Sequence, residues 1–205
     1  MVDHKIIRDS VHGSIRVDEE FLPLVEAPEL QRLHSIHQLG LAYLVYPGAN
    51  HTRFEHSLGT FAVARRICDS LGLEREEARQ VMAAALLHDI GHYPFAHSLK
   101  DLAVEAHEAL ASRQILSEFA RPIRQHLRVE PEAVAAIIDH RVDYRGPVDV
   151  RFFWNLLSGV LDPDKLDYLN RDAFFCGVPY GVQDVDFILE EVSPDPARGV
   201  AISRK

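Results

Sequence analysis

The chain has 205 residues, of which 47% are hydrophobic, so it is long enough for one large domain with a buried core. Its formal net charge of −9 argues against a general nucleic-acid binder, because affinity for a phosphate backbone depends on clustered Lys and Arg. A small polyanionic substrate is not excluded, since a bound divalent ion and a few cations can reverse the sign of the charge inside one pocket.

Two features concern the cellular setting of the chain. No apolar stretch approaches the roughly 20 residues needed to cross a bilayer, and the N-terminus lacks a secretory apolar region. We therefore expect a soluble cytoplasmic protein with no membrane partner. Cys68 and Cys176 form neither a C-x-x-C pair nor a disulfide framework, so both are expected to be core thiols.

The predicted elements begin with a small β-hairpin at 5–18, in which alternating β-branched residues flank a turn at Gly13. The pattern then changes to helical spacing. Pro28 is well placed for the first turn of a helix that closes at Gly40. Residues 43–48 are typical of a short connector bounded by turns.

Longer helices fill the rest of the chain. One is predicted from about Arg53 to Leu71, and the next from Glu74 to about Asp89. The second is nearly all apolar over 81–87, so it should be a buried central helix. Further helices are predicted at 98–103, 106–119, 131–139, 150–160, 164–173 and 184–191, with prolines at many of the breaks. The predicted fold class is mainly α, with the hairpin before a helical core at 19–192 in a single domain that spans 1–205.

The dipeptide His88-Asp89 follows the apolar run and points to metal chemistry. Consecutive helical residues project about 100° apart, so the imidazole and the carboxylate can bracket one ion. Mixed N/O ligation suits Zn, Fe, Mn, Ni or Co, and such an ion lowers the pKa of a bound water and polarises a phosphoryl oxygen. A histidine in an apolar helix is more often a hydrogen-bonded core residue, but a buried carboxylate is costly unless it is paired or coordinated.

Several sequence blocks occur in one order along the chain: Gln38-Leu39-Gly40, Tyr46-Pro47-Gly48-Ala49, H-T-R-F-E-H-S-L-G at 51–59, H-D-I-G-H-Y-P-F-A-H at 88–97 and D-K-L-D-Y at 164–168. Together they closely resemble the HD-domain metal-dependent phosphohydrolases, in particular the deoxynucleoside triphosphate triphosphohydrolase branch. The resemblance covers about 5–187 and implies an HD-domain helical bundle. It implies His56, His88, Asp89 and Asp164 as ligands of one divalent transition metal ion, with Mg accompanying the nucleotide.

Two other carboxylates compete with Asp164 for the last ligand position. Asp162 precedes Pro163, which is typical of a helix N-cap with proline at the first helical position. The other competitor is Asp167. Asp164 is preferred because it lies directly before Lys165, as the family's ligand does.

The resemblance also implies catalytic groups. Arg53 matches an arginine that contacts the α-phosphate, which its fork of donors suits. The alternative for Arg53 is a surface ion pair with a residue such as Glu55. His92, His97 and His107 match pocket histidines, and the last two are candidates to protonate the leaving oxygen.

Substrate contacts follow in the same way. Gln38 and Asp172 match positions that hydrogen-bond a sugar 3′-hydroxyl, and Leu39 with Gly40 matches a wall that disfavours a ribose 2′-hydroxyl. The alternative for that wall is an ordinary helix C-terminus. Lys165 matches a lysine that contacts phosphate, and Tyr168 matches a residue that packs against the sugar.

The chain also departs from the family. Lys100, with Asp101 beside it, stands where the family often has an acidic residue, and family members usually continue beyond residue 205. Alarmone hydrolases and cyclic dinucleotide phosphodiesterases match the blocks less well. The expected activity is hydrolysis of a dNTP to deoxynucleoside and tripolyphosphate, in a homo-oligomer. Alternatives are a phosphomonoesterase or phosphodiesterase on another nucleotide, and a non-catalytic nucleotide sensor.

Overall fold

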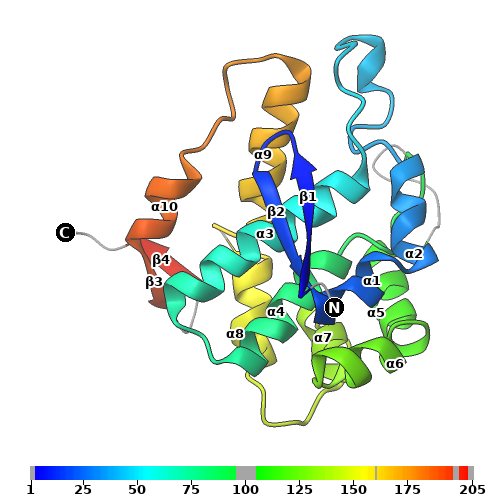
Figure 1. Cartoon of the computed structure of the whole chain (residues 1–205), viewed down its shortest axis with the longest axis vertical. Helices are drawn as coiled ribbons and strands as arrows, with labels where there is room; N and C mark the ends of the chain where they lie inside the picture. Colours follow the sequence, from blue (N-terminus) through cyan, green and yellow to red (C-terminus); the bar gives the residue numbers. More distant parts are fainter. Residues whose placement is uncertain (1–2, 96–104, 160, 196–198, 203–205) are drawn as a thin grey trace.

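The computed structural model describes residues 3–95, 105–159, 161–195 and 199–202. These residues form a mainly helical structure with two small antiparallel sheets, which confirms the predicted fold class. Helix α3 (Arg53–Leu71) crosses the molecule, and α4 (Arg75–Leu87) and α9 (Pro163–Cys176) pack against it (Figure 1). Further helices are α1 (Leu22–Val25), α2 (Pro28–Gln31), α5 (His107–Ser117), α6 (Ala120–Pro122), α7 (Pro131–Ile138), α8 (Val150–Leu157) and α10 (Val185–Glu191).

The predicted N-terminal hairpin is present. Strand β1 (His4–Asp9) pairs with β2 (Gly13–Asp18) in antiparallel register, and β2 lies against α3 (Figure 1). A second hairpin, β3 (Val192–Asp195) with β4 (Gly199–Ile202), was not predicted. Its strands have only four residues each, and Pro194 weakens the strand pattern.

The bounds of α3 agree with the prediction and have local causes. The side chain of Thr52 accepts a hydrogen bond from the Glu55 amide, and the Glu55 carboxylate accepts one from the Thr52 amide, which forms a capping box. The helix ends before Gly72, which has a left-handed conformation. Arg53 is therefore the first residue of α3, and His56 lies one turn further along.

Helix α4 is the buried central helix that the apolar run predicts, because every side chain from Val81 to Leu87 is buried. It ends two residues earlier than predicted. His88 is the C-cap and Asp89 lies in the following turn. The backbone of His88 keeps helical angles (φ −59°, ψ −34°), so the two side chains still diverge from the end of the helix.

The predicted helix from Pro28 to Gly40 is wrong beyond its first two turns. Helix α2 gives way to a 3₁₀ turn, η2 (Arg32–Ser35), and Ile36 is extended. The guanidinium of Arg32 donates to the backbone carbonyls of Ile90 and His92, which fixes this segment against the turn after α4. Residues 36–40 therefore form a loop, and the predicted helix at 98–103 lies outside the described residues.

Helix α9 is longer than predicted and begins at its expected cap. The Asp162 carboxylate accepts a hydrogen bond from the Lys165 amide at 2.6 Å, which confirms Asp162 as the N-cap. Cys68 is buried in α3 as expected, but Cys176 is partly exposed at the end of α9, so it is not a core thiol. In the described part of the chain, no helix combines the length and the apolar character needed to cross a bilayer.

Candidate metal centre

A cavity of about 320 Å³ lies where the loop after η2, α3, the turn after α4, α5 and α9 meet. Among the described residues, its lining consists of ones that the sequence identified as candidates: Gln38, Leu39, Arg53, His56, His88, Asp89, His92, His107, Asp164, Tyr168 and Asp172. Lys165 is not among the lining residues, and His97 lies outside the described residues. A larger hollow of about 830 Å³ lies elsewhere, and arginines in its wall already pair with acidic residues.

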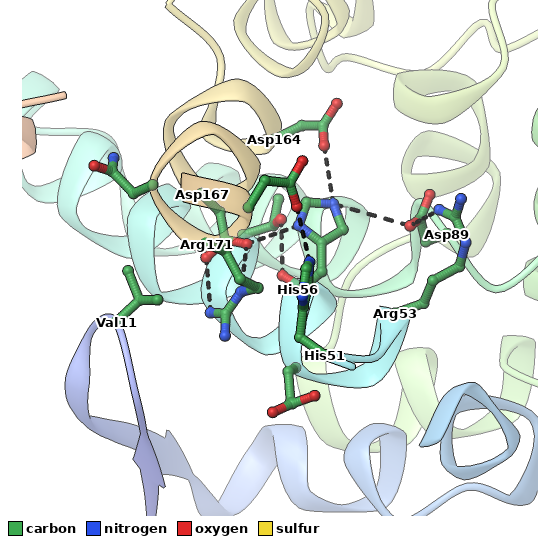
Figure 2. A network of polar contacts seen from close by, with 12 residues as sticks. Val11, His51, Arg53, His56, Asp89, Asp164, Asp167 and Arg171 are labelled. Atoms are coloured by element: carbon green, nitrogen blue, oxygen red, sulfur yellow. Dashed lines mark hydrogen bonds and ion pairs between the residues drawn. The ribbon is translucent and has the colours of Figure 1, made fainter. Parts of the chain in front are cut away.

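The four predicted metal ligands face one another in this cavity. His56 Nε2 lies 2.9 Å from Asp164 Oδ1 and 3.9 Å from Asp89 Oδ2 (Figure 2). His88 Nε2 lies 3.4 Å from Asp89 Oδ1 and 3.7 Å from Asp164 Oδ1. Atoms of His56, His88 and Asp164 that could ligate a metal all lie within 4.8 Å of one another, whereas Asp89 falls into a second such group with His92 and His107.

Both imidazoles are held from behind. Nδ1 of His56 donates to Asp167 Oδ2 at 2.7 Å, and Nδ1 of His88 donates to the Ala85 carbonyl at 2.8 Å. Each ring therefore directs Nε2 into the cavity. His88 Nε2 is buried and makes no hydrogen bond within the described part of the chain. Such a nitrogen beside two carboxylates fits a divalent transition metal, which accepts mixed N/O ligands.

The electrostatics of the cavity favour bound cations. Although burial opposes ionisation, the hydrogen bond from His56 and the charge of the nearby His88 imidazole lower the pKa of Asp164. Burial likewise opposes protonation of His56, but Asp164 and Asp167 raise its pKa to about 10. The pKa of Asp89 is also lowered well below its ordinary value, against the effect of burial, by His88 and Arg53. The carboxylates are thus ionised and attract positive charge into the cavity.

Arg53 is buried at 3% exposure and directs its guanidinium at Asp89. Nη1 lies 2.5 Å from Asp89 Oδ2 (Figure 2), and Nε makes no hydrogen bond among the described residues. Glu55 instead caps α3, so the alternative of an Arg53–Glu55 surface pair is wrong. Nε of Arg53 is therefore an unused donor on a side chain that lines the cavity.

The rings of His92 and His107 stack with their centroids 3.8 Å apart, and His92 Nε2 lies 3.2 Å from Asp89 Oδ1. Gly91 makes this arrangement possible. A Cβ at Gly91 would lie 2.0 Å from the His107 carbonyl oxygen, so a side chain there would separate α5 from the turn after α4. Burial and the neighbouring His92 lower the pKa of His107 to about 4, so its ring is neutral at pH 7.

The predicted sugar contacts Gln38, Leu39, Tyr168 and Asp172 also line the cavity. Leu39 and Gly40 lie in the loop, so the alternative of an ordinary helix C-terminus is wrong for them. Asp172 Oδ1 accepts a hydrogen bond at 2.8 Å from Nε2 of His51, whose side chain is fully buried. Lys165 binds Asp162 and, at 2.9 Å, the Gly159 carbonyl, which directs its ammonium to the start of α9.

Sequence reasoning did not assign a supporting role to His12, His51, Asp167 or Arg171. Asp167 was weighed only as a competitor of Asp164 for the metal, and it lies behind His56 instead (Figure 2). His51 and Asp167 do belong to the blocks that carry the family resemblance. Their presence there was a usable signal, but their hydrogen-bond partners are set by tertiary contacts.

Comparisons with known proteins agree with this geometry. A family model described as HD domain matches residues 53–169, more than half of the chain. Uncharacterized protein MJ1154 of Methanocaldococcus jannaschii is 39% identical over 92% of this chain and 38% of its own length. Human deoxynucleoside triphosphate triphosphohydrolase SAMHD1 is 30% identical over 85% of this chain and 34% of its own length.

A solved structure described as a phosphohydrolase (BT4208) from Bacteroides thetaiotaomicron has a TM-score of 0.83 and 36% identity. The match covers 97% of this chain and 48% of that one. The chain thus spans about half or less of the length of each of these proteins. The sequence blocks, the helical fold and the matched family model lead to one conclusion: the chain belongs to the HD domain family, with phosphohydrolases among its relatives.

Proposed function

We propose that this chain is a metal-dependent nucleotide phosphohydrolase that converts a deoxynucleoside triphosphate to a deoxynucleoside and tripolyphosphate. The observation that carries the proposal is the buried His88 Nε2, which makes no hydrogen bond among the described residues and faces Asp89 and Asp164. The choice of a deoxynucleotide is supported by the name of the human relative and by the predicted sugar contacts that line the cavity.

His56, His88, Asp89 and Asp164 would hold one divalent ion, of Mn, Fe, Zn, Ni or Co. When bound, such an ion supplies a water of lowered pKa and polarises a phosphoryl oxygen. Arg53 would contact the α-phosphate through donors that its pair with Asp89 leaves unused.

The chain's own residues would orient the substrate and move protons. Water attacks the α-phosphorus and loses a proton to solvent, the bond from that phosphorus to O5′ breaks, and O5′ leaves as the hydroxyl of the deoxynucleoside after it gains a proton. His107 is neutral at pH 7 in this structure, but a bound polyphosphate would raise its pKa and favour the imidazolium that can donate that proton. His92 and His97 are the other proposed pocket histidines.

On the sugar side, Gln38 and Asp172 would hydrogen-bond the 3′-hydroxyl, Tyr168 would pack against the ring, and Leu39 would disfavour a 2′-hydroxyl. These side chains line the same cavity as the proposed metal ligands. Lys165 would serve a phosphate only after its ammonium leaves Asp162. Arg53 is therefore the better-placed cation for the phosphate.

The test is a product assay with purified protein loaded separately with Mn, Fe, Co, Ni and Zn. The substrates are dNTPs, the matching NTPs, nucleoside monophosphates and cyclic nucleotides. Release of deoxynucleoside with tripolyphosphate supports the proposal, and His88→Ala, which removes the unbonded nitrogen, should abolish it. No release of nucleoside or phosphate from any nucleotide would refute an enzymatic role.

A second candidate is a phosphomonoesterase or phosphodiesterase that acts on another nucleotide. The observation that favours it is that the Lys165 ammonium binds Asp162 instead of lining the cavity. Arg53 is then the only Lys or Arg among the described lining residues, and a single cation suits a substrate with fewer phosphate charges than a triphosphate. Release of orthophosphate, or of a nucleoside monophosphate from a diester, would identify this activity. Binding of metal and nucleotide without turnover would instead indicate a sensor module.

A further inference from the structure

The turn of the β1–β2 hairpin reaches the rear of the proposed metal centre. Figure 2 shows Val11, at this turn, on the side of Asp167 and Arg171 that faces away from Asp89. Asp9 closes the turn, because its Oδ1 accepts hydrogen bonds from the amides of Val11 at 2.9 Å and His12 at 2.8 Å. The hairpin therefore presents a fixed carboxylate and a fixed imidazole to α9.

Asp167 is fully buried and joins the hairpin to the metal centre. Its Oδ1 accepts a hydrogen bond from His12 Nε2 at 2.6 Å, and its Oδ2 accepts one from His56 Nδ1 at 2.7 Å. Arg171 donates to both oxygens at 2.9 Å. Within the described part of the chain, the hydrogen bonds to this carboxylate thus come from the hairpin, from α3 and from α9 itself.

Arg171 links Asp167 back to the hairpin. Its side chain is fully buried and also donates to Asp9, at 2.8 Å to Oδ2 and at 3.2 Å to Oδ1. Asp9, Arg171, Asp167 and His12 thus form a closed set of hydrogen bonds that spans 162 positions of sequence. His56 is attached to this set through Nδ1 and to the cavity through Nε2.

We infer that the β1–β2 hairpin positions the metal ligand His56: His12 fixes Asp167, and Asp167 fixes the tautomer and the orientation of the His56 ring. This inference rests on the proposed function, because it assigns His56 to a metal. Groups that hold a ligating imidazole from behind typically change metal affinity by about 10- to 100-fold when they are removed. His12 is thus a positioning residue, although it does not line the cavity.

The test measures binding of Co²⁺ alone to the purified chain by calorimetric titration and by its visible absorption spectrum. His12→Ala should raise the Kd for Co²⁺ about 10-fold and shift the absorption bands, because the His56 ring is less fixed. His12→Gln should restore most of the affinity, since an amide N–H can still donate to Asp167. Arg8→Ala is the matched control, because Arg8 is an exposed residue of the same hairpin that bonds Ser14.

Thermal unfolding of the metal-free proteins separates positioning from simple loosening. The metal-free His12→Ala variant should melt below Arg8→Ala by no more than the few degrees that one hydrogen bond to Asp167 contributes, and only His12→Ala should lose affinity for Co²⁺. If His12→Ala does not fold, His12→Phe replaces it, because its ring fills the same space but cannot donate to Asp167, and the same loss of Co²⁺ affinity is expected.

Equal Kd values and spectra for wild type and the positioning variant would overturn the inference, and so would an equal loss in Arg8→Ala. If the wild-type chain does not bind Co²⁺, the proposed metal centre fails together with the inference. If the wild type binds and the variant is unchanged, only the inference fails.

Discussion

Gly59 lies in the middle of α3, where its hydrogen faces the ion pair behind the metal centre. A Cβ at this position would lie 1.8 Å from Asp167 Oδ1, 2.6 Å from Asp167 Cγ and 2.4 Å from Arg171 Nη2. Both neighbouring side chains are fully buried and are held by several hydrogen bonds, so they cannot move aside without breaking those bonds. We predict that Gly59→Ala destabilises the protein.

The size of the effect follows from two opposing contributions. Replacement of glycine by alanine inside a helix ordinarily stabilises a protein by about 1 kcal/mol. Disruption of a buried ion pair costs about 3–5 kcal/mol. The free energy of unfolding of Gly59→Ala should therefore be about 2–4 kcal/mol lower than that of wild type.

Urea unfolding followed by far-ultraviolet circular dichroism measures this difference. The sign is decisive, because helix propensity alone predicts a gain in stability. A Gly59→Ala variant that is as stable as wild type, or more stable, would refute the placement of Asp167 and Arg171 against α3. A second comparison localises the clash: in an Asp167→Ala background, the added methyl group should cost less than in wild type, because its nearest contact is gone.

Three further predictions concern other parts of the site. Gly91→Ala should lower kcat/KM for the proposed nucleotide at least 10-fold, because its Cβ would displace the backbone of His107; unchanged activity would contradict this. Asp9→Asn should lower the free energy of unfolding by about 2 kcal/mol at pH 7. Burial opposes ionisation of Asp9, but the Arg171 guanidinium lowers its pKa below the value in the unfolded chain. The stabilisation is therefore present above the unfolded pKa and is lost as the pH falls through the folded pKa. Urea titrations at several pH values should show the stabilities of wild type and Asp9→Asn converging in acid. His51→Ala should raise KM for a dNTP about 10-fold with little change in kcat, because Asp172 loses a fixing hydrogen bond; a 2′,3′-dideoxynucleotide should show no such change.

Local sequence patterns predicted the elements that hold the site. The apolar run of α4 and the capping residues of α3 depend on neighbours within a few positions, so α3 was placed correctly and α4 to within two residues at its end. The loop at 36–40 was misassigned because its course depends on Arg32, which reaches backbone carbonyls near position 90. Such a contact has no local signature.

The supporting residues were missed for the same reason. His12 and Asp167 are 155 positions apart, and nothing in the alternation of the hairpin shows that its turn meets α9. Residue types that can ligate a metal are visible in the sequence. The groups that orient them from behind the cavity are brought together by tertiary packing, which the sequence does not show. The family resemblance identified the first kind and left the second to the structure.

The distribution of charge explains why the site needs both the residues that can ligate a metal and the groups that orient them. Asp89 and Asp167 are buried and Asp164 is partly exposed beside the same His56 ring, so the three carboxylates need nearby cations. Asp167 has Arg171, which cannot be deprotonated, and it is therefore neutralised permanently at the rear. Asp164 instead faces His56, whose positive charge comes from a proton that a metal ion can replace. The arginine keeps Asp167 ionised and fixed behind His56, so a proton or a metal can exchange on the cavity side without loss of the ring's orientation.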